Sequence, residues 1–241
     1  INIRAEKLKP LYKLKKAIIM FFDTRKLASE FIGTLFLVAT VVGSGIMAES
    51  LAGGNAAVAL LGNTLATAGI LYVLITCLGP VSGAHFNPAV SFVFCLKGEL
   101  VPAHCVQYII FQCLGAMAGV MLAHAMFDQS LIQAGVKIRF GSNIWLSEGV
   151  ATFGLVATIL TGLRHKPESV ASLVSLYITA GYWFTSSTSF ANPAVTLGRS
   201  FTNSFSGIRL SDMPFFVIAQ FLGAALAYYL VRELLSKKHS Q

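Results

Sequence analysis

The tripeptide Asn-Pro-Ala occurs twice, as Asn87-Pro88-Ala89 and as Asn192-Pro193-Ala194. Each copy ends a short polar tract and opens an apolar stretch, about 87–96 and about 192–203, that is too short to cross a bilayer as a helix. Proline suits the first turn of a helix, where its missing N–H would have no intrahelical partner, and a preceding asparagine can cap the helix. We therefore predict two half helices that begin at these asparagines.

Composition places the chain in a membrane. Of its 241 residues, 55% are hydrophobic and 12% are charged, and the mean hydropathy of +0.71 exceeds that of soluble domains. Six stretches are long enough to span a hydrocarbon core of about 30 Å. They cover 27–48, 58–79, 103–127, 145–163, 169–186 and 213–235.

The basic residues predict an orientation. If the N-terminus lies in the cytoplasm, fourteen of the eighteen Lys and Arg residues fall on the inner side, eight of them within 1–26. The positive-inside rule then puts both termini in the cytoplasm, with a basic segment over 1–26 and a tail over 236–241. The net charge of +8 therefore indicates orientation and not nucleic-acid binding. We expect an integral protein of a bacterial inner membrane.

An internal duplication fixes the topology. Residues 28–42 match 146–160 at seven of fifteen positions, and the tract at 112–116 matches that at 220–224. Each Asn-Pro-Ala lies between the matched pieces of its own half. Because each repeat carries three crossings, the second repeat enters the membrane from the opposite face.

The predicted fold class is an all-α membrane protein of six transmembrane helices and two re-entrant half helices in an inverted repeat. We expect the repeats at 27–127 and 145–235, joined by an extracellular loop over 128–144. Inversion brings the two half helices together N-terminus to N-terminus at mid-membrane, where each contributes a partial positive charge. Cations and protons are then repelled, and neutral molecules accept hydrogen bonds from the amides of Asn87 and Asn192.

Several of these features resemble the aquaporin (major intrinsic protein) family. They are the tract Ser82–Val90, the second Asn-Pro-Ala-Val, the paired Glu30 and Glu148, and the six-span layout over about 27–235. The resemblance implies a homotetramer with one pore per subunit that passively conducts water or small uncharged solutes and excludes ions. The partners would be the bilayer and those solutes.

The sequence departs from the family pattern at the selectivity filter. In most members Arg follows the second Asn-Pro-Ala, whereas Val195 stands here. Spacing carries the other filter positions over to Thr67, Ser189 and either Ala180 or Tyr182. Water-selective members resemble one another in having Phe and His at two of these positions, and neither is present. This set implies a wider, aquaglyceroporin-type constriction for glycerol-like polyols and water, with a water-selective channel as the alternative.

The tract 189–196 also resembles a bacterial subgroup linked to metalloids, which adds arsenous acid to the expected solutes. Arg199 lies four residues beyond Val195, on nearly the same helix face. It either replaces part of the missing filter charge in the vestibule, or reaches the outer interface or ties down loop carbonyls.

Three ionisable groups lie near the expected re-entrant loops. Glu30 and Glu148 are either proton-relay groups or acceptors for the loop N–H groups, and their duplication favours loop support. His85, beside Asn87, either gates the pore by protonation or stabilises its loop, and the second role is favoured.

Two other classes of protein remain. The four cysteines have no metal-ligand spacing and the chain has no Gly-x-Ser-x-Gly elbow, so we expect no enzyme, metal or cofactor. Gradient-coupled secondary transporters also use inverted repeats and broken helices. Their midplane sites are charged or ion-coordinating, whereas these half helices begin with neutral asparagine.

Overall fold

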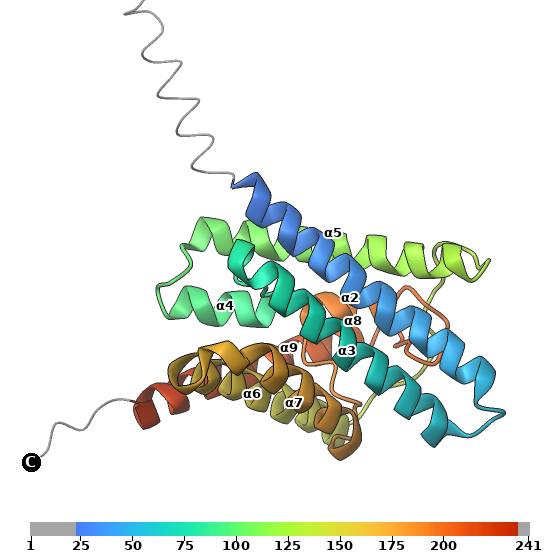
Figure 1. The fold of residues 1–241 in the computed structure, drawn as a ribbon. Coiled ribbons are helices and arrows are strands. Elements are labelled where there is room, and N and C mark those ends of the chain that lie inside the picture. Colours follow the sequence, from blue (N-terminus) through green and yellow to red (C-terminus); the bar gives the residue numbers. More distant parts are fainter. Residues whose placement is uncertain (1–22, 236–241) are drawn as a thin grey trace, which may run out of the picture.

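The computed structural model describes residues 23–235, which form a helical bundle without strands in that range (Figure 1). Five helices are long and apolar enough to cross a membrane. They are α2 (Thr24–Leu51), α3 (Ala56–Ser82), α5 (Pro102–Met126), α6 (Ser142–His165) and α9 (Met213–Leu235). Three shorter elements complete the bundle, namely α4 (Pro88–Leu96), α7 (Val170–Phe184) and α8 (Pro193–Arg199).

The fifth predicted span, 169–186, corresponds to the shorter helix α7. A 3₁₀ turn, Pro167–Ser169, extends the helical segment at its N-terminal end. At the other end Thr185 adopts extended backbone, and its hydroxyl donates to the carbonyl of Gly181, which closes the helix. Most of the predicted basic segment and all of the predicted tail lie outside the described residues.

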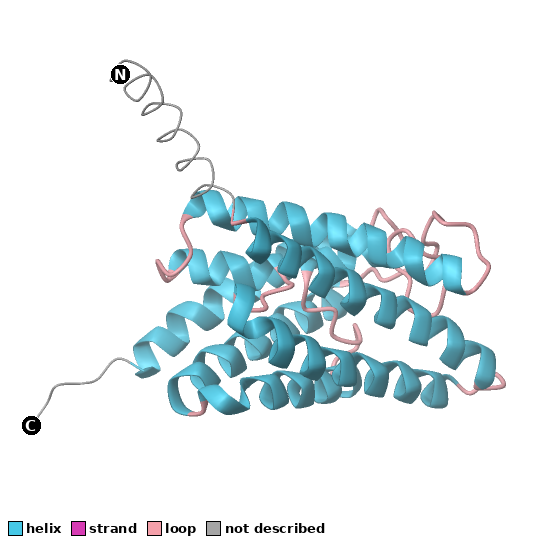
Figure 2. Cartoon of the chain, turned by 45° about the horizontal axis from the view of Figure 1, so that its top comes forward, coloured by secondary structure: helices cyan, strands magenta, loops and turns pink. Residues whose placement is uncertain are grey.

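The two repeats have the same internal arrangement. Helix α2 packs against α3 and α5 in the first repeat, as α6 packs against α7 and α9 in the second. Contacts between α3 and α7 join the repeats. Figure 2 shows loop segments that enter the bundle between the long helices. These are the segments that precede α4 and α8.

Two predicted boundaries are corrected. The second half helix ends at Arg199 and not near 203, because the N–H and hydroxyl of Ser200 both bond back to the carbonyl of Leu197. Helix α6 begins at Ser142, so the connecting loop is shorter than the predicted 128–144.

Close approach of α5 to α2 depends on Gly115 and Gly119. A Cβ atom at these positions would overlap the carbonyl oxygen of Phe31 or Leu35. We expect Gly119→Ala to lower the free energy of unfolding by about 2 kcal/mol, because overpacking forces the two backbones apart. Thermal unfolding of the detergent-solubilised protein measures this. Gly69→Ala is the matched control, since a Cβ there meets nothing within 4 Å; equal unfolding temperatures for the two variants would contradict the prediction.

Candidate functional site

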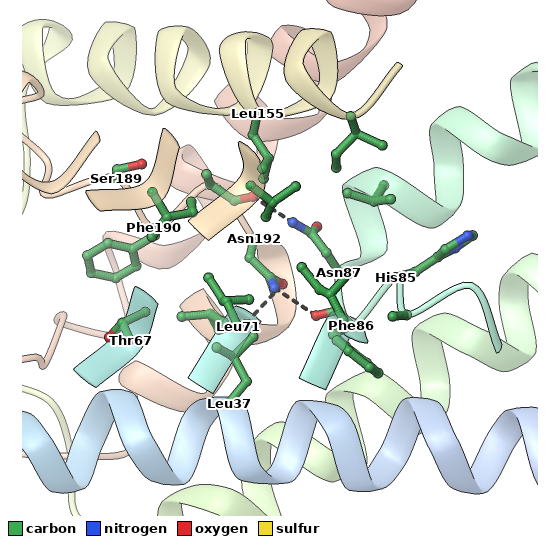
Figure 3. Close-up of a pocket in the computed structure, with 18 of the residues that line it drawn as sticks. Leu37, Thr67, Leu71, His85, Phe86, Asn87, Leu155, Ser189, Phe190 and Asn192 are labelled. Carbon is green, nitrogen blue, oxygen red and sulfur yellow. Dashed lines mark hydrogen bonds between the residues drawn. The ribbon is translucent and has the colours of Figure 1, made fainter. Parts of the chain in front are cut away.

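The two asparagines meet at the centre of the bundle. The Nδ2 of Asn87 donates to the carbonyl of Ala191 at 2.7 Å, and the Nδ2 of Asn192 donates to the carbonyl of Phe86 at 2.8 Å (Figure 3). Each amide therefore ties its own loop to the backbone of the other loop. A side-chain amide has two N–H donors, so one donor of each asparagine remains for a passing molecule.

The same side chains start the half helices. The Oδ1 of Asn87 accepts from the N–H of Ala89, and the Oδ1 of Asn192 accepts from the N–H groups of Ala194 and Val195. Both asparagines have extended backbone and both are N-caps followed by proline. The oxygen of each amide is thus used within its helix, which orients the nitrogen toward the opposite loop.

The backbone before each asparagine is unusual in the same way. Ala84 and Phe86, three residues and one residue before Asn87, have φ values of 51° and 47°. Ser189 and Ala191 occupy the same positions before Asn192, and both have a φ of 49°. Left-handed backbone at four residues other than glycine is strained, and the surroundings must hold it in place.

Glu30 holds the first loop. Its carboxylate is fully buried and accepts from the N–H groups of His85 at 3.0 Å and Phe86 at 2.7 Å, and from the hydroxyl of Ser82 at 2.6 Å. Because N–H and C=O point in opposite directions across a trans peptide, the carbonyls of these peptides face away from Glu30. They face the cavity between the loops, which the loop residues line.

Glu148 makes the equivalent contacts in the second loop. Its carboxylate accepts from the N–H groups of Phe190 and Ala191, both at 2.9 Å. These contacts match the loop-support role that the duplication favours. Few acceptor positions remain free on either carboxylate, which argues against the proton-relay alternative.

Two glutamines complete this arrangement, and the sequence reasoning assigned them no role. The Nε2 of Gln112 donates to Glu30 at 2.7 Å and to Ser91 in α4 at 2.9 Å. The Nε2 of Gln220 donates to Glu148 at 2.7 Å and to Thr196 in α8 at 2.8 Å. Both glutamines lie in the matched tracts of the repeats. Their equivalent positions could have identified them from the sequence.

A cavity of about 110 Å³ runs past the asparagines. Figure 3 shows Thr67, Ser189 and Phe190 to one side of the asparagine pair and His85 to the other. Apolar side chains form much of the wall, including Leu37, Leu71, Leu155, Val174 and Ile178. A passage with one apolar wall and one edge of carbonyls and hydroxyls suits amphipathic solutes.

Four side chains occupy the predicted filter positions, and we call them the constriction residues: Thr67, Tyr182, Ser189 and Val195. All four are buried and line the cavity. The hydroxyls of Thr67 and Tyr182 lie 3.2 Å apart. Three of these side chains carry a hydroxyl, and Tyr182, one of the two candidates for its position, is the bulkiest of the four.

Of the two candidates on α7, the structure favours Tyr182 over Ala180. Ala180 is exposed, whereas Val174, Ile178 and Tyr182, spaced four residues apart along α7, all line the cavity. Two residues from Tyr182 correspond to about 200° around a helix, which turns Ala180 away from the cavity.

Arg199 is at the same end of the cavity and is only 2% exposed. Its Nε donates to the carbonyl of Ser206, and its Cζ lies 3.4 Å from the ring centroid of Phe190. The side chain therefore holds a loop carbonyl, as one of the expected roles has it, and does not reach the lipid interface. Phe190 was not predicted as a site residue, and nothing in the sequence distinguishes its ring from other apolar side chains.

The loop between α5 and α6 adds two further cations near this end. Arg139 donates to the carbonyls of Ser187 and Gly207, and Lys137 donates to that of Phe205. Burial, and then the neighbouring charges of Arg139 and Arg199, lowers the pKa of Lys137 to about 8. Three cationic side chains, those of Lys137, Arg139 and Arg199, thus lie near one another at this end.

His85 lies at the opposite end of the cavity. Its Nδ1 is 3.0 Å from the hydroxyl of Ser91, and its ring centroid is 4.6 Å from that of Phe94. These contacts fit the loop-support role. Within residues 23–235 no group of three or more His, Cys, Asp or Glu side chains could hold a metal ion.

Comparison with known proteins decides the family. The family model described as "Major intrinsic protein" matches residues 18–184. The chain belongs to the major intrinsic protein family. Channels of this family pass water and small solutes through membranes, so this major intrinsic protein is an integral membrane channel and not an enzyme.

Three proteins illustrate the range of this similarity. "Aquaglyceroporin AqpS" of Rhizobium meliloti (strain 1021) is 60% identical, over 89% of this chain and 92% of its own length. "Aquaporin PIP2-5" of Oryza sativa subsp. japonica is 30% identical, over 84% of this chain and 80% of its own length. The X-ray structure of the aquaglyceroporin from Plasmodium falciparum matches with a TM-score of 0.64 at 20% identity, over 88% of this chain and 96% of that one, and it supports the fold alone. The predicted fold class and family are thus confirmed.

Proposed function

We propose that this chain is an aquaglyceroporin-type channel that passes glycerol-like polyols and water. One observation carries the proposal, namely that neutral Val195 occupies the constriction at the position where most family members have Arg. The similarity to the Rhizobium meliloti aquaglyceroporin over most of the chain supports the same class.

The chemistry of the cavity fits this class of solute. A polyol has a face of C–H groups and an edge of hydroxyls. The C–H face packs against Leu37, Leu71 and Ile178, and the hydroxyls exchange hydrogen bonds with the loop carbonyls and the free asparagine donors. A polyol therefore loses little of its hydrogen bonding when it leaves water.

Ion exclusion and passage of arsenous acid belong to the same proposal. The meeting helix starts at Asn87 and Asn192 carry partial positive charge, which opposes cations and protons. Arsenous acid is uncharged at neutral pH and presents hydroxyls as a polyol does.

A water-selective channel is the second candidate. The observation in its favour is the hydroxyl contact between Thr67 and Tyr182, which narrows the constriction.

We propose a homotetramer in a bacterial inner membrane, with both termini cytoplasmic. Large apolar side chains are exposed along the long helices, for example Leu65, Leu176, Leu222 and Leu226, which suits contact with lipid or with neighbouring subunits. Chemical crosslinking in the membrane, which is expected to give a tetramer, tests the assembly.

Stopped-flow light scattering on proteoliposomes tests the solute class. We expect glycerol and water fluxes well above those of empty liposomes, independent of any imposed proton or sodium gradient. Rapid water flux without glycerol flux would select the water-selective alternative. Glycerol flux that requires a gradient would identify a coupled transporter.

A further inference from the structure

Two buried polar atoms at the constriction have no protein partner. The Nη1 of Arg199 and the Oγ of Ser189 are buried, and neither forms a hydrogen bond with any atom of residues 23–235. Both side chains line the cavity. An unpaired buried donor costs about as much free energy as a lost hydrogen bond, so such groups persist where water or a ligand pairs with them.

The geometry brings the Arg199 guanidinium back toward the constriction. Helical side chains point toward the N-terminus of their helix, so Arg199, one turn beyond Val195, directs its guanidinium back along α8. The stacking on Phe190 and the bond from Nε to the carbonyl of Ser206 fix it there. Phe190 directly follows Ser189, which places the two unpaired groups around the same part of the cavity.

Arg139, the neighbouring cation, has no such unpaired buried nitrogen. Arg139 lies 4.9 Å from the same ring of Phe190, but its Nε and Nη1 donate to the carbonyls of Gly207 and Ser187. Its guanidinium is used to hold loops together. In Arg199 the Nε is bonded, whereas the Nη1 is buried without a partner.

We infer that Arg199 supplies the fixed charge of the constriction and binds the permeating solute there. Its Nη1 donates to a solute oxygen, while the hydroxyl of Ser189 bonds to the same oxygen or to its neighbour. The guanidinium charge opposes the entry of protons and cations at the constriction, where Val195 itself contributes no charge. The inference rests on the proposed function and extends it by naming the residue that recognises neutral hydroxylated solutes.

Substitution of Arg199 tests this in proteoliposomes with two readouts: the ratio of glycerol flux to water flux, and the proton leak under a potassium diffusion potential. For Arg199→Met we expect the flux ratio to fall about tenfold, because a charge-assisted hydrogen bond is lost. We expect the proton leak to rise about tenfold, because the fixed charge is gone. Arg199→Lys keeps the charge but not the planar donors, so its leak should stay at the wild-type level while its flux ratio falls.

Arg209→Gln is the matched control. It also removes a guanidinium charge, but Arg209 is partly exposed, pairs with Asp212 and is absent from the cavity lining. Retained water flux shows that a variant is folded. If Arg199→Met does not assemble, Arg199→Lys and Ser189→Ala test the inference instead. Both should lower the ratio of glycerol flux to water flux.

The inference is overturned if the assembled Arg199 variants match Arg209→Gln in both readouts. Wild-type protein that passes no glycerol would instead refute the proposed function, while the leak comparison would still test the charge of Arg199.

Discussion

Replacing Glu148 by leucine is expected to remove most of the folded channel from the membrane. The substitution leaves the N–H groups of Phe190 and Ala191 without their acceptor in a region where water does not replace it, and it removes one of the two acceptors of the Gln220 amide. Each such group costs about 1–3 kcal/mol, so we expect a loss of about 3 kcal/mol or more in the free energy of unfolding. Membrane yield and the unfolding temperature of the purified protein measure the effect.

The same substitution at Glu99 is the control. Glu99 is exposed and pairs with Lys97 at the end of α4, an interaction worth about 1 kcal/mol or less. Glu148→Gln should lie between the two, because an amide retains one acceptor oxygen. An unfolding temperature for Glu148→Leu equal to that of Glu99→Leu would show that the carboxylate does not support the loop.

Introducing arginine at Val195 should reduce glycerol flux much more than water flux. Val195 is 5% exposed and lies within the constriction, so the larger side chain must occupy the passage. A second guanidinium also meets that of Arg199 in a buried setting, where repulsion is weakly screened. We expect at least an approximately tenfold fall in the ratio of glycerol to water flux, equivalent to about 1.4 kcal/mol. Stopped-flow light scattering gives both rates.

Val195→Leu separates size from charge, because it adds bulk without a donor. A moderate fall in the ratio is expected for leucine and the full fall for arginine. If Val195→Arg reduces both fluxes by the same factor, the constriction does not select by size.

The parts of the channel that follow from repetition could be predicted from sequence. The duplicated Glu30 and Glu148, the paired Asn-Pro-Ala tracts and the odd number of crossings together specify an inverted pair of half helices. Each of these features is carried by residue type and spacing within a short segment. The contacts of both carboxylates with loop N–H groups match the favoured interpretation.

The constriction was less predictable because it combines residues from four segments. Whether Ala180 or Tyr182 faces the cavity depends on the length of the loop before α7, and one residue of slippage rotates a helix by about 100°. The role of Phe190 depends on where Arg199 directs its long side chain, which sequence spacing does not determine. Gln112 and Gln220 were visible as a matched pair, but their partners became apparent only when α4 and α8 were placed beside them.

The crossed bonds of Asn87 and Asn192 have a consequence for how flow could be controlled. Each loop is anchored to the backbone of its counterpart, so neither moves without detaching the other. The width of the passage at the asparagines is therefore fixed. Widening or closing it there would break the hydrogen bonds that join the two repeats. Any valve in this molecule would have to operate at the two mouths, beside His85 or Arg199.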